Sequence, residues 1–180
     1  VGYTGDQQAA PILLAGLEKL EYRGYDSAGL AVRDGEGVPE VVKAKGRLRA
    51  LAEKTDNGRA MRGNCGIGHT RWATHGEPSQ TNAHPHVSGN CSRSGSGAVE
   101  SEVVGVHNGI IENYLKLREW LILKGYNFCS ETDTEVIPNL IDYYYNGDLL
   151  DSVIKATAKL EGSFAIGVIS NNEPDKLIAV

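Results

Sequence analysis

The sequence predicts a layered α+β fold. Strand-like segments occur as antiparallel hairpins, one around the glycines Gly35 and Gly37 and one across residues 171–175. Helix-like segments, with apolar residues at helical spacing, occur in separate runs and do not alternate one by one with the strands. This order favours stacked layers of helices and antiparallel sheets over a doubly wound parallel sheet.

The first third of the chain is predicted to contain both strands and helices. Leu13, Leu17 and Leu20 recur at i, i+4 and i+7, which predicts one face of a helix over residues 8–21. The other elements expected here are strands over 1–3, 28–33, 38–44 and 65–72 and a helix over 47–54.

The rest of the chain opens with a segment rich in Gly, Ser, Asn and Pro, which predicts a long loop over 73–102. Gly125 is expected to end one helix, and Asp148 and Gly162 to begin and end another. The elements expected after the loop are a short strand over 103–107, helices over 112–124, 134–145 and 149–160, and strands over 163–170 and 176–180.

Composition narrows the possible functions. The chain has 180 residues, which suits one domain, and its net charge is −5. An acidic chain without a basic run is not expected to have nucleic acid or an anionic membrane as its main partner. No apolar run has the length of a membrane helix or the pattern of a signal peptide. Because both ends fall inside predicted strands, we expect residues 1–180 to be a fragment of a longer domain.

The cysteines are odd in number and widely spaced. Cys65, Cys91 and Cys129 form no C-x-x-C pair, so the simplest prediction is three reduced thiols in a cytoplasmic protein. A structural zinc site is an alternative, because Cys65, His69, His75, His84, His86 and Cys91 are all possible ligands. Their spacing matches no common zinc motif, so no metal and no cofactor is predicted.

Four polar segments are not explained by helix or strand periodicity. They are Tyr22–Gly29 (YRGYDSAG), His69–Gly76 (HTRWATHG), His107–Gly109 (HNG) at a predicted strand end, and Glu131–Glu135 (ETDTE). Each could be a solvated turn or a helix cap; Asn-Gly in particular is a common turn signal. Four such segments at the ends of regular elements nevertheless indicate a functional site.

The first two of these segments resemble the glutaminase domain (glutamine amidotransferase type 2) of the glutamine–fructose-6-phosphate transaminase (isomerising) family, and the resemblance covers residues 1–180. It implies an N-terminal-nucleophile hydrolase fold, a four-layer α-β-β-α sandwich with two antiparallel sheets. It also implies an N-terminal cysteine nucleophile three residues before Val1, so the chain as given lacks the first three residues and the C-terminal part of the domain. The segment 90–101 is longer than is usual in the family.

The resemblance also implies roles for individual residues. Asn108 and Gly109 match the oxyanion hole, Arg71 matches the clamp for the carboxylate of L-glutamine, and Asp133 matches the residue that holds its ammonium group. The remaining substrate-binding matches are Trp72 on a mobile loop, Thr74, His75, Arg23 and Gly24.

The expected activity is hydrolysis of L-glutamine to supply ammonia to a C-terminal sugar-phosphate isomerase domain, in a protein that forms a homodimer. The chain as given is expected to be inactive, because none of its cysteines matches the nucleophile. Two alternatives remain open: a non-catalytic glutamine-binding module on the same fold, and a zinc-stabilised interaction domain.

Overall fold

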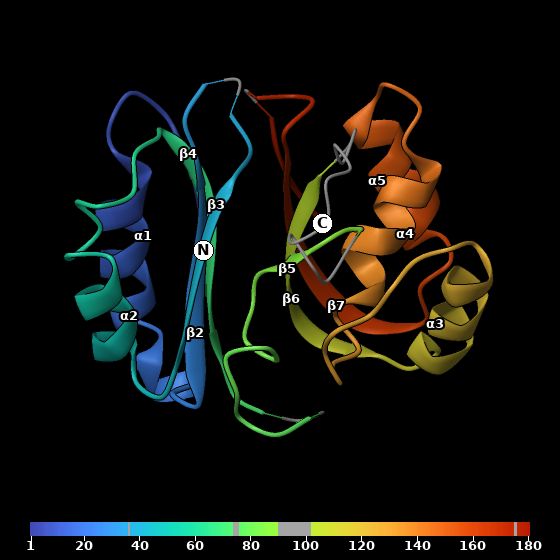
Figure 1. Ribbon diagram of the computed structural model, residues 1–180, viewed down its shortest axis with the longest axis horizontal. Helices are drawn as coiled ribbons and strands as arrows, with labels where there is room; N and C mark the ends of the chain where they lie inside the picture. The colour runs from blue at the N-terminus through green and yellow to red at the C-terminus, as the bar shows by residue number, and fades with distance from the viewer. Residues whose placement is uncertain (36, 74–75, 90–101, 175) are drawn as a thin grey trace.

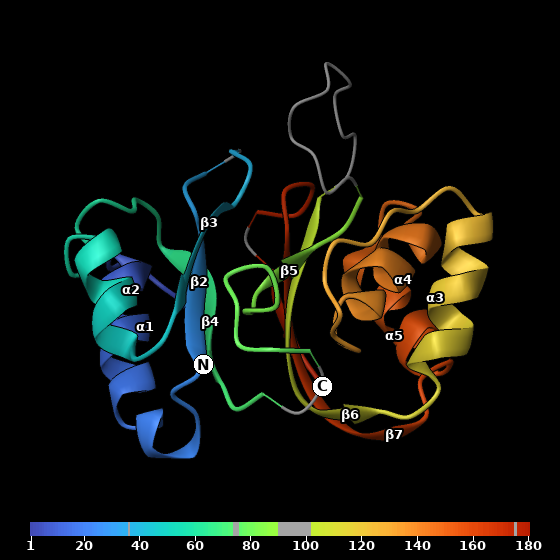
Figure 2. The ribbon, with the colours of Figure 1, turned by 60° about the horizontal axis from the view of Figure 1, so that its bottom comes forward.

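The computed structural model describes residues 1–35, 37–73, 76–89, 102–174 and 176–180. Two four-stranded antiparallel sheets lie face to face and are covered by helices on their outer sides (Figure 1). Turning the molecule shows the same succession of helices, sheet, sheet and helices (Figure 2). The predicted four-layer α-β-β-α arrangement is therefore present.

The first sheet is built mainly from the N-terminal third of the chain. Its strand order is β1-β4-β2-β3, and every neighbouring pair is antiparallel. The strands are β1 (Gly2–Thr4), β2 (Ser27–Arg33), β3 (Glu40–Lys45) and β4 (Cys65–Arg71). In the register of β1 and β4, Gly2 lies opposite Ile67 and Thr4 opposite Cys65.

The second sheet has the order β5-β6-β7-β8 and is also antiparallel. Its strands are β5 (His86–Val87), β6 (Val103–Ile111), β7 (Gly162–Ser170) and β8 (Leu177–Ala179). Together the two sheets place the C-terminal ends of β4 and β6, which carry the predicted site residues Arg71, Asn108 and Gly109, in one region of the molecule.

Each sheet buries its outer face against amphipathic helices. On the first sheet, Leu13 and Leu17 of α1 (Ala9–Glu18) pack with Leu51 of α2 (Leu48–Lys54). A short 3-10 helix, η1 (Glu21–Arg23), follows α1. The second sheet is covered by α3 (Tyr114–Leu123), α4 (Val136–Tyr144) and α5 (Leu149–Thr157). Asp148 begins α5 as predicted, and its carboxylate accepts hydrogen bonds from the backbone of Leu150 and Asp151.

The inner faces of the sheets form a third, smaller core. Its buried members come from both sheets and are Ala31, Cys65, Ile67, Val104, Val106 and Ile169. The buried side chain of Arg33, at the end of β2, crosses between the sheets. Its guanidinium donates hydrogen bonds to the carbonyls of Ser170 and of Asn171, the latter at 2.7 Å, and to that of Gly35 at 2.9 Å.

Three sequence predictions need correction. The segment 73–102 is not loop throughout, because β5 pairs with β6 there. Asn108 and Gly109 do not form a turn at a strand end: β6 continues to Ile111, with Asn108 opposite Ala165. The left-handed φ of +140° at Gly109 is accommodated within the strand. The Asn-Gly pair, which commonly indicates a turn, therefore does not form one here. Gly162 does not end a helix but begins β7.

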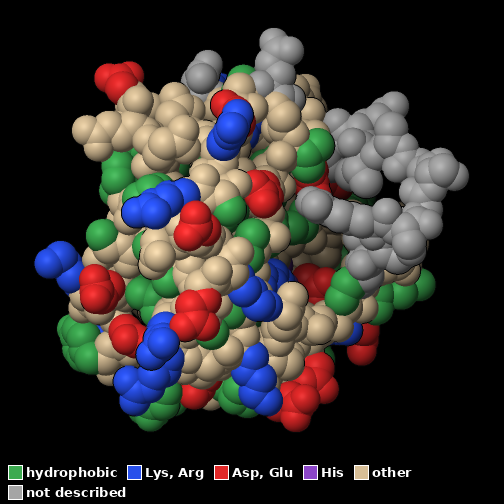
Figure 3. All heavy atoms as spheres, turned by 60° about the vertical axis from the view of Figure 1, so that its left-hand side comes forward, with side chains coloured by type: hydrophobic (Ala, Val, Ile, Leu, Met, Phe, Trp, Pro, Cys, Tyr) green, Lys and Arg blue, Asp and Glu red, His purple; other side chains and the backbone are tan. Residues whose placement is uncertain are grey.

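The outer surface over α1 and α2 carries Lys, Arg, Asp and Glu side chains interspersed with one another (Figure 3). No helix in the described ranges is long and apolar enough to cross a membrane.

Candidate active site

A pocket of about 280 Å³ lies where the ends of β4 and β6 meet the segment before α4. Six of the predicted site residues line it: Arg23, Arg71, Trp72, Asn108, Gly109 and Asp133. Arg71 and Asp133, which are 62 positions apart in the sequence, thus face the same space. Thr74 and His75 lie outside the described residues.

Arg71 is the last residue of β4, and its guanidinium is held by the loop that follows. It donates to the carbonyl of Gly76 at 3.2 Å and is 3.5 Å from that of Glu77. Burial lowers the pKa of Arg71, and the carboxylates of Asp26 and Asp133 oppose that shift. An arginine stays protonated in proteins, so the pocket contains a fixed positive charge.

Asp133 supplies the opposite charge. It is only 5% exposed, and its Oδ2 accepts a hydrogen bond of 2.9 Å from the backbone N–H of Ile111 at the end of β6. The carboxylate is therefore fixed to the strand that carries Asn108 and Gly109. A positive and a negative group in one small pocket suit a ligand that is itself a zwitterion.

Asn108 and Gly109 are exposed on β6, beside this pair of charges. A side chain at Gly109 would place its Cβ 2.0 Å from the carbonyl oxygen of Ser163 on β7. Only glycine fits there, and its backbone is available to a bound molecule. An amide side chain next to such a backbone position is suited to stabilising a developing negative charge on oxygen.

Aromatic side chains flank the pocket entrance. Trp72 is 56% exposed and makes an edge contact with Tyr25, with ring centroids 5.5 Å apart. Gly24 does not line the pocket but lies against β4, where a Cβ would be 2.9 Å from the carbonyl carbon of Arg71. Its role in the structure is therefore close packing behind Arg71.

The pocket also contains residues that were not predicted as part of the site. His84, His107 and Thr134 line it, together with His69 from β4. The segment with His84 approaches β2 at Gly29, where a Cβ would be 2.1 Å from the His84 carbonyl oxygen. The sequence signal for this segment is His84-Pro85-His86, whose residue types indicate possible zinc ligands and do not by themselves predict a place in the pocket.

These histidines are uncharged near neutral pH. Burial lowers the pKa of His69 to about 3 and lowers that of His84 well below its usual range. Burial also lowers the pKa of His107, while the carboxylate of Asp133 partly opposes this shift. The base of the pocket is therefore made of neutral imidazoles, and the charged groups that line the pocket are Arg23, Arg71 and Asp133.

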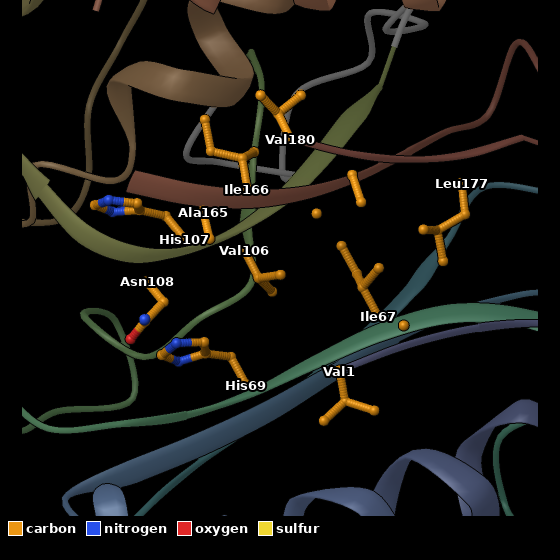
Figure 4. A pocket seen from close by; sticks show the side chains of 13 residues that line it. Val1, Ile67, His69, Val106, His107, Asn108, Ala165, Ile166, Leu177 and Val180 are labelled. Carbon is orange, nitrogen blue, oxygen red and sulfur yellow. The ribbon is translucent and has the colours of Figure 1, made fainter. Parts of the chain in front are cut away.

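Two further hollows share lining residues with this pocket, and both are also lined by Val1. One hollow, of about 260 Å³, is lined by Arg23, His69, Thr70, Asn108 and Val1. Another of about 260 Å³ runs between the sheets from Val1 and Asn108 to Leu177 and Val180. The side chains of His69 and Asn108 are turned toward one another at one end of it (Figure 4).

Neither cysteine of the described residues belongs to the pocket. Cys65 is not disulfide-bonded and is buried in the core between the sheets. Cys129 is disulfide-bonded and lines a different hollow. The expectation of three reduced thiols is wrong for Cys129, because spacing along the chain does not determine which sulfurs meet in space. Cys91 lies outside the described residues.

Metal binding finds no support in the part of the chain that the structure describes, because no three His, Cys, Asp or Glu side chains are grouped to hold an ion. His69 and His84 stack on each other, and His84 and His86 meet at an angle. Cys91 and His75, two of the six candidate ligands, are outside those ranges.

Comparison with known proteins identifies the family. The model of the glutamine amidotransferase domain matches residues 95–180. Over all 180 residues the chain is 57% identical to a glutamine–fructose-6-phosphate aminotransferase (isomerizing) of Clostridium acetobutylicum. It is 52% identical to the enzyme of that name from Aquifex aeolicus, over 181 aligned positions. The chain belongs to the glutamine amidotransferase domains.

The solved structures agree with this assignment. The amidotransferase domain superposes on glutamine phosphoribosylpyrophosphate amidotransferase from B. subtilis with a TM-score of 0.78 and 26% identity, covering 94% of this chain and 34% of that one. A second match, to an allosteric regulatory enzyme of purine biosynthesis, has a TM-score of 0.77 and 28% identity, covering 94% and 35%. The predicted N-terminal-nucleophile hydrolase fold is thereby confirmed.

The amidotransferase domain spans 28% of the length of the Clostridium acetobutylicum and Aquifex aeolicus relatives. It corresponds to the glutaminase domain of those larger enzymes, as the sequence resemblance implied.

Proposed function

We propose that the domain hydrolyses the side-chain amide of L-glutamine. The ammonia would serve the conversion of fructose 6-phosphate to glucosamine 6-phosphate, in hexosamine biosynthesis, in the parent protein. The observation that carries this proposal is the presence of Arg71, Asp133, Asn108 and Gly109 around one pocket of about 280 Å³. The names of the relatives support the same activity.

In this proposal the two charges bind the two charged groups of the ligand. The guanidinium of Arg71 binds the α-carboxylate, for which a planar donor pair is well suited. The carboxylate of Asp133 binds the α-ammonium. The side-chain amide of glutamine then reaches Asn108 and Gly109. Trp72 closes over the ligand, with Thr74 and His75 as further contacts. Arg23 lines the end of the pocket near the nucleophile, and Gly24 supports the site by packing behind Arg71.

The nucleophile is proposed to be a cysteine three residues before Val1. The N-terminal amino group of Val1 donates to the carbonyl of Gly68 at 2.9 Å, and the backbone N–H of Gly68 donates to the carbonyl of Val1 at 2.8 Å. If β1 continued backwards in this register, the third residue before Val1 would lie opposite Arg71. Opposed residues point to the same face of a sheet, so its side chain would face the pocket.

The chemistry requires one nucleophile and one proton carrier. The cysteine thiol gives its proton to its own α-amine and the sulfur attacks the amide carbon. The negative charge that forms on the amide oxygen is stabilised by the side-chain N–H of Asn108 and the backbone N–H of Gly109. Ammonia leaves with the proton from the amine, and water hydrolyses the thioester to glutamate.

Further parts of the proposal concern the parent protein. Its partners are L-glutamine and a C-terminal sugar-phosphate isomerase domain, and the full-length protein is a homodimer. Cytoplasmic location stays a prediction, and the disulfide at Cys129 removes the cysteine argument for it. A non-catalytic glutamine-binding module is the alternative that shares the Arg71 and Asp133 contacts but has no nucleophile.

The test compares the 180-residue chain with the complete domain beginning Cys-Gly-Ile before Val1, with the cysteine amine free. We expect glutamate and ammonia to form from L-glutamine only with the complete domain, and not when serine replaces the cysteine. Turnover by the 180-residue chain would disprove the assignment of the nucleophile. Binding without turnover by the complete domain would favour the binding module.

A further inference from the structure

Thr134 places one hydroxyl oxygen within reach of three polar groups at the base of the pocket. Its Oγ1 is 2.9 Å from Nδ1 of His107, 3.2 Å from Nε2 of His84 and 3.5 Å from Oδ1 of Asp133. All four side chains are at least nine-tenths buried. A hydroxyl has one proton and two lone pairs, so three partners use its full capacity.

The direction of these hydrogen bonds starts at His84. Its Nδ1 accepts from the backbone N–H of His107, with a distance of 3.5 Å between the nitrogens. Because burial keeps His84 neutral, its single ring proton is then on Nε2, which donates to Thr134. The backbone of β6 thus sets the tautomer of a side chain that comes from a segment 23 residues earlier.

The remaining contacts follow from donor and acceptor counting. One lone pair of the Thr134 oxygen receives the His84 proton. If the second lone pair receives a proton from Nδ1 of His107, both histidines donate to Thr134. The proton of the Thr134 hydroxyl then points to the charged Oδ1 of Asp133, which is the strongest acceptor among the three partners. Oδ2 of Asp133 is already held by the backbone N–H of Ile111. Both oxygens of this carboxylate then have a donor, and its rotation is blocked.

We propose that His84, His107 and Thr134 are positioning residues, which direct the Thr134 hydroxyl at Asp133 and so hold its carboxylate for the α-ammonium of glutamine. This inference rests on the proposed function, because it assigns Asp133 to the ligand's ammonium. It adds residues that act on the ligand through Asp133. Their influence should be limited to binding of the ammonium group, because Arg71, which is assigned to the carboxylate, is held separately by the carbonyls of Gly76 and Glu77.

The test uses two ligands that differ only at the ammonium group: L-glutamine and glutaramate, the same molecule without its amine. Their affinities for the 180-residue chain are measured by NMR titration, in which no hydrolysis is expected. For Thr134→Val we expect L-glutamine to bind about tenfold or more weakly, the effect of losing one charge-assisted hydrogen bond. His84→Phe should weaken L-glutamine in the same direction, because the Thr134 hydroxyl is then no longer directed at Asp133. Glutaramate should change less than about twofold, and His84→Gln, which can still donate, should restore most of the L-glutamine affinity.

His86→Phe is the matched control. His86 is equally buried, but it contacts Thr132 at 3.0 Å and not Thr134. It should lower stability while leaving the preference for L-glutamine over glutaramate unchanged. Equal weakening of both ligands by His84→Phe, or no weakening of either, would overturn the positioning role. If the unsubstituted chain and the complete domain bound no L-glutamine, the proposed function itself would fail.

Nitrogen-15 NMR of the imidazoles gives an independent reading. The donor count predicts that the proton of His84 is on Nε2 and that of His107 on Nδ1. Thr134→Val removes the hydroxyl that accepts the Nδ1 proton of His107, so the tautomer of His107 should shift toward Nε2. The Nε2 tautomer for His107 in the unsubstituted chain would overturn the inference, because Thr134 would then donate to His107 and not to Asp133.

Discussion

The imidazole of His69 stacks on that of His84, with ring centroids 4.5 Å apart and an angle of 27° between the planes. His69 belongs to β4 in one sheet, and His84 lies just before β5 of the other. Two neutral rings can be in contact in this way, whereas two protonated rings would repel each other without water between them. The stack therefore connects the packing of the two sheets to the protonation of the site.

We predict that the protein loses stability as the pH falls below about 6.5. An unfolded histidine takes up a proton near that pH, whereas the folded His69 does so only near pH 3 and His84 well below its usual range. The unfolded state therefore binds more protons between these values, so the free energy of unfolding decreases by up to about 1.4 kcal/mol per pH unit for each such histidine.

Urea denaturation between pH 7.5 and 4.5 measures this slope. Burial also lowers the pKa of His86. The variant His86→Phe should therefore make the free energy of unfolding depend less steeply on pH. A free energy of unfolding that stays constant over this range would contradict the prediction.

Arg33 is expected to contribute strongly to stability. Arg33→Met leaves the carbonyls of Ser170 and Asn171 without their buried donor, which should lower the free energy of unfolding by about 2–5 kcal/mol. Arg49→Met is the control, because Arg49 is exposed and pairs with Glu53 four residues on, a contact worth about 0.5 kcal/mol or less. Chemical denaturation of both variants checks this, and similar losses would show that the link between the sheets is unimportant.

Glutamine recognition in the complete domain is predicted to need both charges. Arg71→Lys and Asp133→Asn should each lower kcat/KM for glutamine by at least tenfold, since loss of one partner of a buried charge pair typically costs about 2–5 kcal/mol. Lysine should fail largely because it cannot make the planar two-point contact of a guanidinium. Steady-state kinetics of the single and double variants decide the matter. Near-normal kcat/KM in either single variant would make these residues a structural arginine and a helix-terminal acid.

Two glycines of β6 should respond differently to the same substitution. Gly109→Ala forces a Cβ to 2.0 Å from the Ser163 carbonyl at a left-handed φ of +140°, so we expect loss of turnover and of stability together. Gly105→Ala would place its Cβ 3.8 Å from Pro138 and 3.9 Å from the carbonyl oxygen of Gly167, which are ordinary contacts, and should be tolerated. Asn108→Ala should lower kcat by about 100- to 1000-fold with the fold intact. Thermal unfolding and glutaminase assays separate these outcomes, and an active Gly109→Ala protein would exclude the proposed oxyanion site.

The layers, most strands and the main site segments were predictable because they follow from local pattern. The apolar spacing of Leu13 and Leu17 determines a helix, and Asp148 caps another one. What the sequence did not reveal depends on contacts between distant segments. His84 approaches His107 only because β5 pairs with β6, and the two-residue β5 is too short to be recognised by its pattern. The position of Arg33 between the two sheets likewise depends on contacts between segments that are distant in the sequence.

The register of β1 against β4 determines, by alternation along the strand, which face of the sheet each residue before Val1 would point to. Gly68 is paired with Val1 by two backbone hydrogen bonds, so the positions upstream are counted from a fixed point. With the proposed cysteine three residues earlier, deleting one intervening residue would turn the thiol to the face covered by α1. Deleting two would restore the face but move the thiol by about 6.6 Å along the strand. An amino-terminal tag would leave the thiol in place and remove its free amine, so affinity tags for active protein belong at the other end.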